Sequence, residues 1–195
     1  QNAEAVGAAI RRFQQEMQNG GMRLVNMTPD GSVGGFGTAT GTPNEVDYEH
    51  RTVLFRLLLK KDWKAAADRA ESHPDEASTW IVTKGFNGNL RFLPLHKACV
   101  LQPPETLLQK LLIAFPEGAS SRDQDGWLPI HCACFYGAIN RAITTLLNSY
   151  LKGAQSKDDE GRLPIHYACL KGASQGVVDV LLENFPKGAM SKDDE

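Results

Sequence analysis

The sequence contains no apolar run that approaches the roughly 20 residues needed by a membrane-spanning helix. Its longest run, around residues 53–59, is interrupted by Arg56. We therefore expect no membrane insertion. An excess of basic residues is missing as well, because the formal net charge is −2. This balance argues against a basic surface for nucleic acid, and we expect no nucleic-acid partner.

Cysteine is also scarce, with 4 residues in a chain of 195. A secreted domain stapled by disulfides is usually shorter and denser in cysteine. We therefore expect an intracellular reducing compartment, with the cytoplasm as first choice. An organelle stays open, because the first residue is Gln and a targeting peptide could have been removed.

Common signatures of catalytic and nucleotide-binding sites are absent. The Gly/Thr-rich segment 28–45 suggests a phosphate loop, but it has neither Gly-Lys-Ser/Thr nor G-x-G-x-x-G. We interpret this segment as a linker. No G-x-S-x-G motif of a nucleophilic serine is present, and Asp-Asp-Glu at 158–160 fits solvated turn residues. The chain is predicted to be no enzyme and to need no cofactor.

What the sequence does contain is an internal repeat with an offset of 35 residues. DQDGWLPIHCACFYGA begins at Asp123 and returns as DDEGRLPIHYACLKGA at Asp158. The related stretch LPLHKAC begins one offset earlier, at Leu93. A period of this length is typical of supersecondary units that stack on one another.

Each copy predicts two helices followed by a hairpin-like finger. Pro129 and Pro164 suit the first position of a helix, while Gly137 and Gly172 suit the left-handed conformation that ends one. The second helix carries an apolar stripe. Its members are Ile143, Leu146 and Leu147 in one copy and Val177, Val178, Leu181 and Leu182 in the next.

This pattern resembles the ankyrin repeat, D-x-x-G-x-T-P-L-H-x-A-A-x-x-G followed by a helix with Leu-Leu and by Gly-Ala. The matching residues are Asp158, Gly161, Pro164, Ile165, His166, Ala168, Gly172, Leu181, Leu182, Gly188 and Ala189. The period is 35 instead of 33, leucine replaces threonine, and cysteine replaces the second alanine. This variant is similar to divergent ankyrin-like arrays of diatoms and related algae. The resemblance implies an all-α repeat fold, an α-solenoid of stacked helix pairs.

The chain is predicted to divide into five segments, with one long β-hairpin finger near 79–92. An N-terminal helix, with Val6, Ile10, Phe13 and Met17 on one face, either packs on the array or docks on a partner. The segments are 1–47 (helix and linker), 48–82 (atypical capping helix pair), 83–122, 123–157 and 158–195 (three repeats). Because the sequence stops within a repeat, we expect more repeats to follow.

The letters HCAC at 131–134 look like a metal site or a reactive thiol. Equivalent residues of stacked units lie roughly 10 Å apart, which is too far to share one metal ion. His131, Cys132 and Cys134 occupy one helical turn and cannot all point to one ion. No metal site is therefore expected. The resemblance implies that His96, His131 and His166 tie down finger backbone and that Cys99, Cys134 and Cys169 are small buried packing residues.

The resemblance further implies binding of a protein partner through the concave groove of the array. Positions that vary between copies are the candidates, and Cys132 is the thiol expected to be exposed there. The predicted partner-binding residues are Phe92, Lys97, Trp127, Cys132, Phe135, Tyr136, Arg162, Tyr167 and Lys171. Two alternatives stay open: a subunit locked permanently into a larger complex, and the regulatory region of an enzyme whose catalytic domain lies elsewhere.

Overall fold

The structure is a computed structural model that describes residues 44–85 and 88–191. Within these ranges, residues 44–83 and 89–191 belong to one compact unit. The helix predicted for Ala3 to Gln18 and almost all of the Gly/Thr-rich linker lie outside the described residues.

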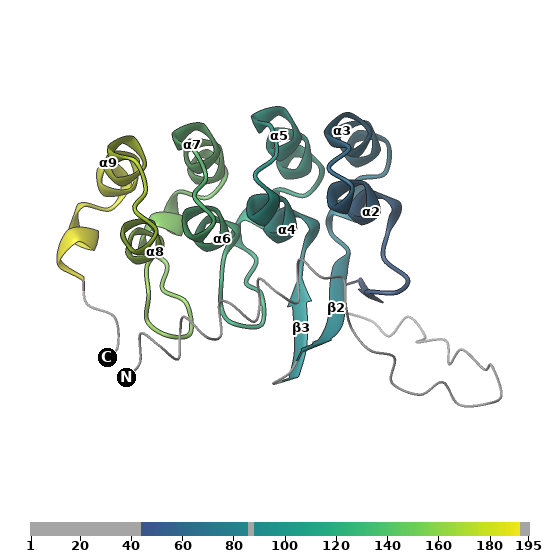
Figure 1. Ribbon diagram of the computed structural model, residues 1–195, viewed down its shortest axis with the longest axis horizontal. Helices are drawn as coiled ribbons and strands as arrows, with labels where there is room; N and C mark the ends of the chain where they lie inside the picture. The colour runs from purple at the N-terminus through teal and green to yellow at the C-terminus, as the bar shows by residue number, and fades with distance from the viewer. Residues whose placement is uncertain (1–43, 86–87, 192–195) are drawn as a thin grey trace. The chain divides into compact units, whose positions relative to one another are not determined.

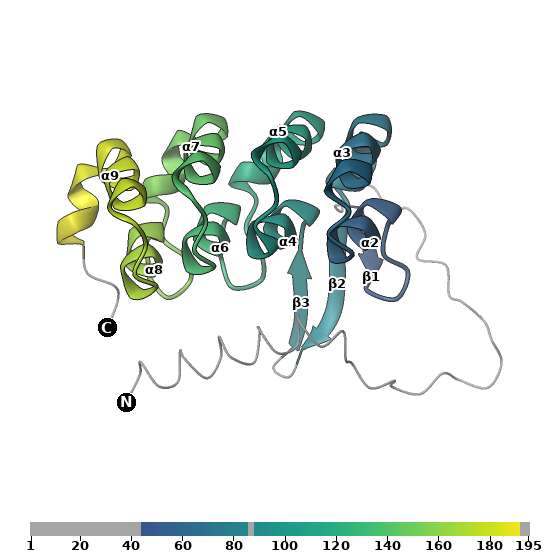
Figure 2. The same cartoon turned by 45° about the horizontal axis from the view of Figure 1, so that its top comes forward.

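Eight helices of the described chain form pairs that repeat along the sequence. The pairs are α2 (Val53–Leu59) and α3 (Trp63–Ser72), α4 (Pro94–Leu101) and α5 (Glu105–Ala114), α6 (Pro129–Phe135) and α7 (Asn140–Ser149), and α8 (Pro164–Leu170) and α9 (Gln175–Asn184). Figures 1 and 2 show α2, α4, α6 and α8 in one row and α3, α5, α7 and α9 in a second row above it. The predicted all-α stack of helix pairs is confirmed.

The ends of the first-row helices follow the predicted proline and glycine positions. Pro129 and Pro164 open α6 and α8, where a missing backbone N–H costs nothing. After these helices, Gly137 and Gly172 have φ values of 77° and 64°. This left-handed backbone favours glycine. The first copy differs, because Gln102 takes up the left-handed conformation there, with φ of 54°.

A turn of 3-10 helix follows each second-row helix, where the sequence predicts only the start of a finger. These turns are η1 (Pro74–Ala77), η2 (Pro116–Ser120), η3 (Leu151–Gln155) and η4 (Pro186–Met190). The turns η2, η3 and η4 each bring a glycine against the ring of the preceding aromatic residue. A Cβ added to Gly118 would lie 3.1 Å from Phe115 Cδ1. The Gly-Ala pair of the repeat thus permits close packing at this turn.

The fingers between η2 and α6 and between η3 and α8 are tight turns. The carboxylate of Asp123 accepts hydrogen bonds from the backbone N–H groups of Asp125 (3.0 Å) and Trp127 (2.8 Å). Gly126 has φ of 73°, and a Cβ there would lie 2.3 Å from Asp159 Oδ1 in the next finger. Glycine is therefore required both by its backbone conformation and by the direct contact between fingers.

The predicted long hairpin finger is present as β2 (Trp80–Gly85) and β3 (Gly88–Phe92). A third strand, β1 (Glu45–Asp47), lies where the sequence predicts the end of a linker and pairs parallel with β2, with Glu45 opposite Trp80. Arg91 ties the three strands together. Its guanidinium carbon lies 3.6 Å from the centre of the Trp80 ring, and its Nε lies 2.7 Å from Glu45 Oε1.

The core runs along the seam between the two rows of helices. Leu54, Phe55 and Leu58 of α2 are fully buried, as is Ile143 of α7, and three leucines of α5 are almost completely buried. In the leading pair, the carboxylate of Glu76 accepts a hydrogen bond of 2.6 Å from the N–H of Leu54 and also binds the guanidinium of Arg69. Burial desolvates Glu76, but Arg69 and this N–H outweigh that effect and lower its pKa.

Candidate functional site

Most of the residues predicted to line the concave groove are packed inside the stack. The buried ones are Phe92, Lys97, Cys132, Phe135 and Tyr167, and Arg162 is almost buried. Their expected exposure is therefore wrong. The columns that vary between copies face the seam between neighbouring repeats, where each side chain must match a different neighbour. Variation in these columns reflects repacking of the seam.

The exposed part of the predicted set surrounds one buried ring. Trp127 and Tyr136 are half-buried, whereas Lys171 is exposed. All three contact Phe135: the ring centroids of Trp127 and Tyr136 lie 5.5 Å and 5.1 Å from its own, and the Nζ of Lys171 lies 4.0 Å from it. We call Trp127, Tyr136 and Lys171 the finger-side surface: Trp127 lies in the finger before α6, and Tyr136 and Lys171 are the C-cap residues of α6 and α8.

The buried Tyr167 supports this surface from inside the stack. Its ring centroid lies 4.6 Å from that of Trp127, and its hydroxyl donates a hydrogen bond of 2.5 Å to Asp158 Oδ2 in the finger. Asp158 in turn accepts a hydrogen bond of 2.8 Å from the N–H of Arg162. The aromatic rings above α6 and α8 are therefore fixed by the finger, and their exposed edges have a defined position.

The hydroxyl of Tyr136 is a buried polar atom with no hydrogen-bond partner among the described residues. Burial raises the pKa of this hydroxyl, so it stays protonated and can donate. A buried donor without an acceptor costs roughly 1–3 kcal/mol.

Lys97 is the least expected member of the buried set, since only 3 % of its surface is exposed. Burial lowers the pKa of its ammonium group to about 8. The residue that follows it by one repeat is Cys132, which is 1 % exposed and whose thiol pKa is raised by burial. Lys97 and Cys132 thus belong to the interior of the stack.

The three repeated histidines join each first helix to the finger that follows it. His131 Nδ1 accepts a hydrogen bond of 2.9 Å from the N–H of Leu128, so its Nε2 carries the proton and donates to the carbonyl of Ser156 at 3.0 Å. His96 and His166 make the equivalent bonds to Trp127 and Ser191. The predicted tie between histidine and finger backbone is confirmed.

The cysteines of the repeat differ in their exposure. Cys99 and Cys134 are buried as predicted, and burial raises the pKa of both thiols. The prediction is wrong for Cys169, which is exposed, and for Cys132, which is buried. Cys169 belongs to α8, the last first-row helix that the structure describes, and no following repeat covers it in the described chain. Thiols kept protonated by burial are poor nucleophiles.

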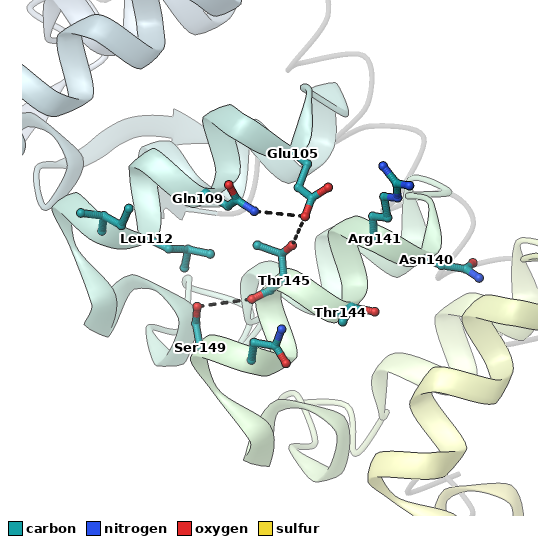
Figure 3. Close-up of a pocket in the computed structure, with 10 residues that line it drawn as sticks. Glu105, Gln109, Leu112, Asn140, Arg141, Thr144, Thr145 and Ser149 are labelled. Atoms are coloured by element: carbon teal, nitrogen blue, oxygen red, sulfur yellow. Dashed lines mark hydrogen bonds between the residues drawn. The ribbon is translucent and has the colours of Figure 1, made fainter.

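A groove on the opposite side of the stack was not predicted from the sequence. It lies between the second-row helices α5 and α7 and has a volume of about 630 Å³. Figure 3 shows its lining as sticks. We call it the outer groove, and six of its residues carry the argument below: Glu105, Gln109 and Ile113 from α5 and Arg141, Thr145 and Asn148 from α7.

Hydrogen bonds hold the floor of the outer groove in place. Glu105 Oε1 accepts bonds from Gln109 Nε2 at 3.1 Å and from Thr145 Oγ1 at 3.3 Å, and the second of these crosses from α7 to α5 (Figure 3). Thr145 is buried, whereas Arg141 and Asn148 are exposed at the rim. The sequence gives little sign of this groove, because polar residues at helical spacing usually form an ordinary solvated face.

Within residues 44–85 and 88–191, no group of three or more His, Cys, Asp or Glu side chains is arranged to hold a metal ion. None of the helices described by the structure is long and apolar enough to cross a membrane.

A comparison with models of protein families finds a match. The family model described as "Ankyrin repeats (3 copies)" matches residues 95–193, which is about half of the chain. The match begins at the second residue of α4 and runs through the helix pairs α4–α5, α6–α7 and α8–α9. No curated protein matches the sequence.

Proposed function

Since the chain belongs to the ankyrin-repeat family, whose repeats generally mediate protein–protein interaction, we propose that it is a non-enzymatic module that binds a protein partner through the finger-side surface. The observation that carries this proposal is the position of Trp127, Tyr136 and Lys171 around Phe135. Aromatic side chains held rigidly beside a cation are typical anchors of protein interfaces.

The finger-side surface suits binding for two physical reasons. Its rings are fixed by Tyr167 and Asp158, so that little conformational entropy is lost when a partner binds. It also presents an exposed cation, because Lys171 can leave Phe135 to meet an acidic group. The remaining predicted residues support this surface from inside the stack.

Affinity capture with quantitative mass spectrometry tests the proposal. The full chain and the variant Tyr136→Ala/Lys171→Glu are used as bait, and Leu151→Ala serves as the control because Leu151 is exposed on η3 away from this surface. We expect a partner that the wild type and the control retain and the double variant loses. Equal recovery with all three baits would contradict binding at the finger-side surface.

A further inference from the structure

We propose that the outer groove is a second docking site, which binds an extended segment of a partner protein with an acidic side chain and, three residues away, a large apolar side chain. This site lies on the second row of helices, so it is separate from the finger-side surface. Three features carry the inference: a cation without a partner at one end, exposed apolar surface at the other, and free amide groups in the lining.

The cation is Arg141, in the first turn of α7. It is exposed and has no ion-pair or hydrogen-bond partner for its guanidinium among the residues that the structure describes. The nearby carboxylate of Glu105 is already engaged by Gln109 and Thr145. In the neighbouring seam between α3 and α5, by contrast, Lys110 and Glu71 pair at 2.7 Å. Arg141 is therefore available to an anionic group from outside.

The place of Arg141 in the helix strengthens this point. A positive charge in the first turn is unfavourable, because the exposed N–H groups there already form the positive end of the helix dipole. The first turn of α7 contains no acidic residue, and no side chain caps it. Arginine at this position thus does nothing for the stability of the helix. It adds to the local positive potential, which favours a carboxylate of the partner.

The far end of the outer groove is apolar. Ile113, near the end of α5, is 75 % exposed, and Leu112 lies beside it in the lining. Figure 3 shows Leu112 at the opposite end of the groove from Arg141. An isolated exposed isoleucine is common on protein surfaces. Here it closes a groove whose other end is charged, and an apolar side chain of a ligand would cover it.

The distance between the two ends sets the spacing in the ligand. Arg141 and Asn148 are two turns apart on α7, which corresponds to about 10 Å along the helix axis. A chain in the extended polyproline II conformation advances about 3.1 Å per residue with three residues per turn, so side chains three residues apart lie on one face and span about this length. When an acidic residue of the ligand lies opposite Arg141, the ligand residue three positions away therefore lies at Leu112 and Ile113.

Two amide side chains in the lining of the groove match a peptide backbone. The carboxamide of Asn148 has no hydrogen-bond partner in the described chain, and that of Gln109 uses only one N–H, for Glu105. A carboxamide carries one acceptor and two donor hydrogens, which is the complement of a backbone C=O and N–H. The groove is also open and not enclosed, as a site for a continuous chain must be (Figure 3).

The test is a titration of the ¹⁵N-labelled full chain, followed by NMR, with the peptide Gly-Ala-Glu-Ala-Thr-Leu-Ala-Gly up to about millimolar concentration, where weak docking is detectable. Two control peptides replace Glu by Lys or Leu by Ser. We expect saturable shifts at Arg141, Asn148 and Ile113 with the first peptide and at least about tenfold weaker binding of both controls. No saturable shift at these residues, or equal binding of all three peptides, would overturn the proposal.

Substitutions in the protein test the two ends of the outer groove independently. Arg141→Glu should weaken binding of the Glu peptide about tenfold and improve binding of the Lys peptide. Arg56→Glu makes the same charge change at an exposed residue of α2 and should do neither. Ile113→Asp should weaken binding of the Glu peptide, whereas the control Leu151→Asp should not. Unchanged affinity of Arg141→Glu would contradict the proposal. These variants leave the finger-side surface intact, so failure here is distinguishable from failure of the proposed function.

Discussion

His131 Nε2 donates a hydrogen bond of 3.0 Å to the carbonyl oxygen of Ser156, which lies 25 residues further along the chain. The same imidazole accepts the N–H of Leu128 at its other nitrogen. One neutral histidine therefore fixes the start of its own helix and the base of the following finger. Because the finger carries Asp158, which binds Tyr167, this bond helps to position the finger-side surface.

Acid should destabilise the fold through these histidines. Burial lowers the pKa of His96 and of His131 to about 4, from about 6.5 in the unfolded chain. The unfolded chain therefore takes up protons first, and stability that is complete above pH 6.5 is lost as the pH falls toward 4. Asp123, whose burial raises its pKa to about 7, acts in the opposite direction. We expect a net loss of about 2 kcal/mol between pH 7.5 and 4.5.

Urea unfolding at the two pH values measures this loss. NMR of the imidazole nitrogens should show both rings neutral, with the proton on Nε2, at pH 5.5. An unfolding free energy that does not fall on acidification, together with protonated rings at pH 5.5, would refute the proposed role of the histidines.

Trp127→Ala should lower the stability of the fold as well as change the surface. The Trp127 ring packs against Tyr167 and Phe135, with centroids 4.6 Å and 5.5 Å away. Removing a half-buried indole should cost about 2–3 kcal/mol of unfolding free energy. Trp127→Phe keeps an aromatic ring at this place and should cost clearly less. Thermal unfolding of the two variants checks the order, and an alanine variant as stable as the wild type would show that the ring is not part of the packing.

Lys97→Met should stabilise the protein at neutral pH. Burial lowers the folded pKa of Lys97 to about 8, below its usual 10.5, so the charged form is penalised in the fold at pH 7. Methionine has similar length and carries no charge. We expect the unfolding free energy to rise by only about 1–2 kcal/mol. The gain is limited because the substitution also removes the contacts of the ammonium group. The exposed Lys152→Met is the control and should change little. A clear loss of stability in Lys97→Met would mean that the ammonium contacts outweigh its burial.

Alkylation of the native protein should distinguish the cysteines. Cys169 is exposed, whereas Cys99, Cys132 and Cys134 are buried and their thiol pKa values are raised. With N-ethylmaleimide at neutral pH, we expect Cys169 to react at least about a hundredfold faster than the other three. Peptide mass spectrometry over time gives the four rates. Fast modification of Cys132 would restore the expectation that it lies on an exposed surface.

The helix boundaries could be predicted because local chemistry fixes them. Proline at position 129 is acceptable only near the start of a helix, and Gly137 adopts the backbone that ends one. The positions of Cys132 and Phe135 could not be predicted in the same way. Variation between copies looks the same whether a residue meets a partner or the next repeat, and only the stacking of α6 on α8 decides between them.

The outer groove was missed for a related reason. Glu105 and Gln109 are one turn apart on α5, as are Arg141 and Thr145 on α7, which is the ordinary pattern of a solvated helix face. Their convergence depends on the distance between two helices that are 35 residues apart in sequence. The β1 strand escaped prediction likewise, because three residues after a linker carry little signal until β2 lies beside them.

The most direct test of the proposed function is the affinity of the captured partner, once purified, for the full chain and for Lys171→Glu. Lys171 is exposed, and its loss removes only the cation–π contact with Phe135, so thermal stability should change little. We predict that calorimetric titration gives at least about a tenfold higher Kd for this variant and no change for the control Lys152→Glu. An unchanged Kd for Lys171→Glu, combined with unchanged affinity of Tyr136→Ala, would contradict binding through the finger-side surface.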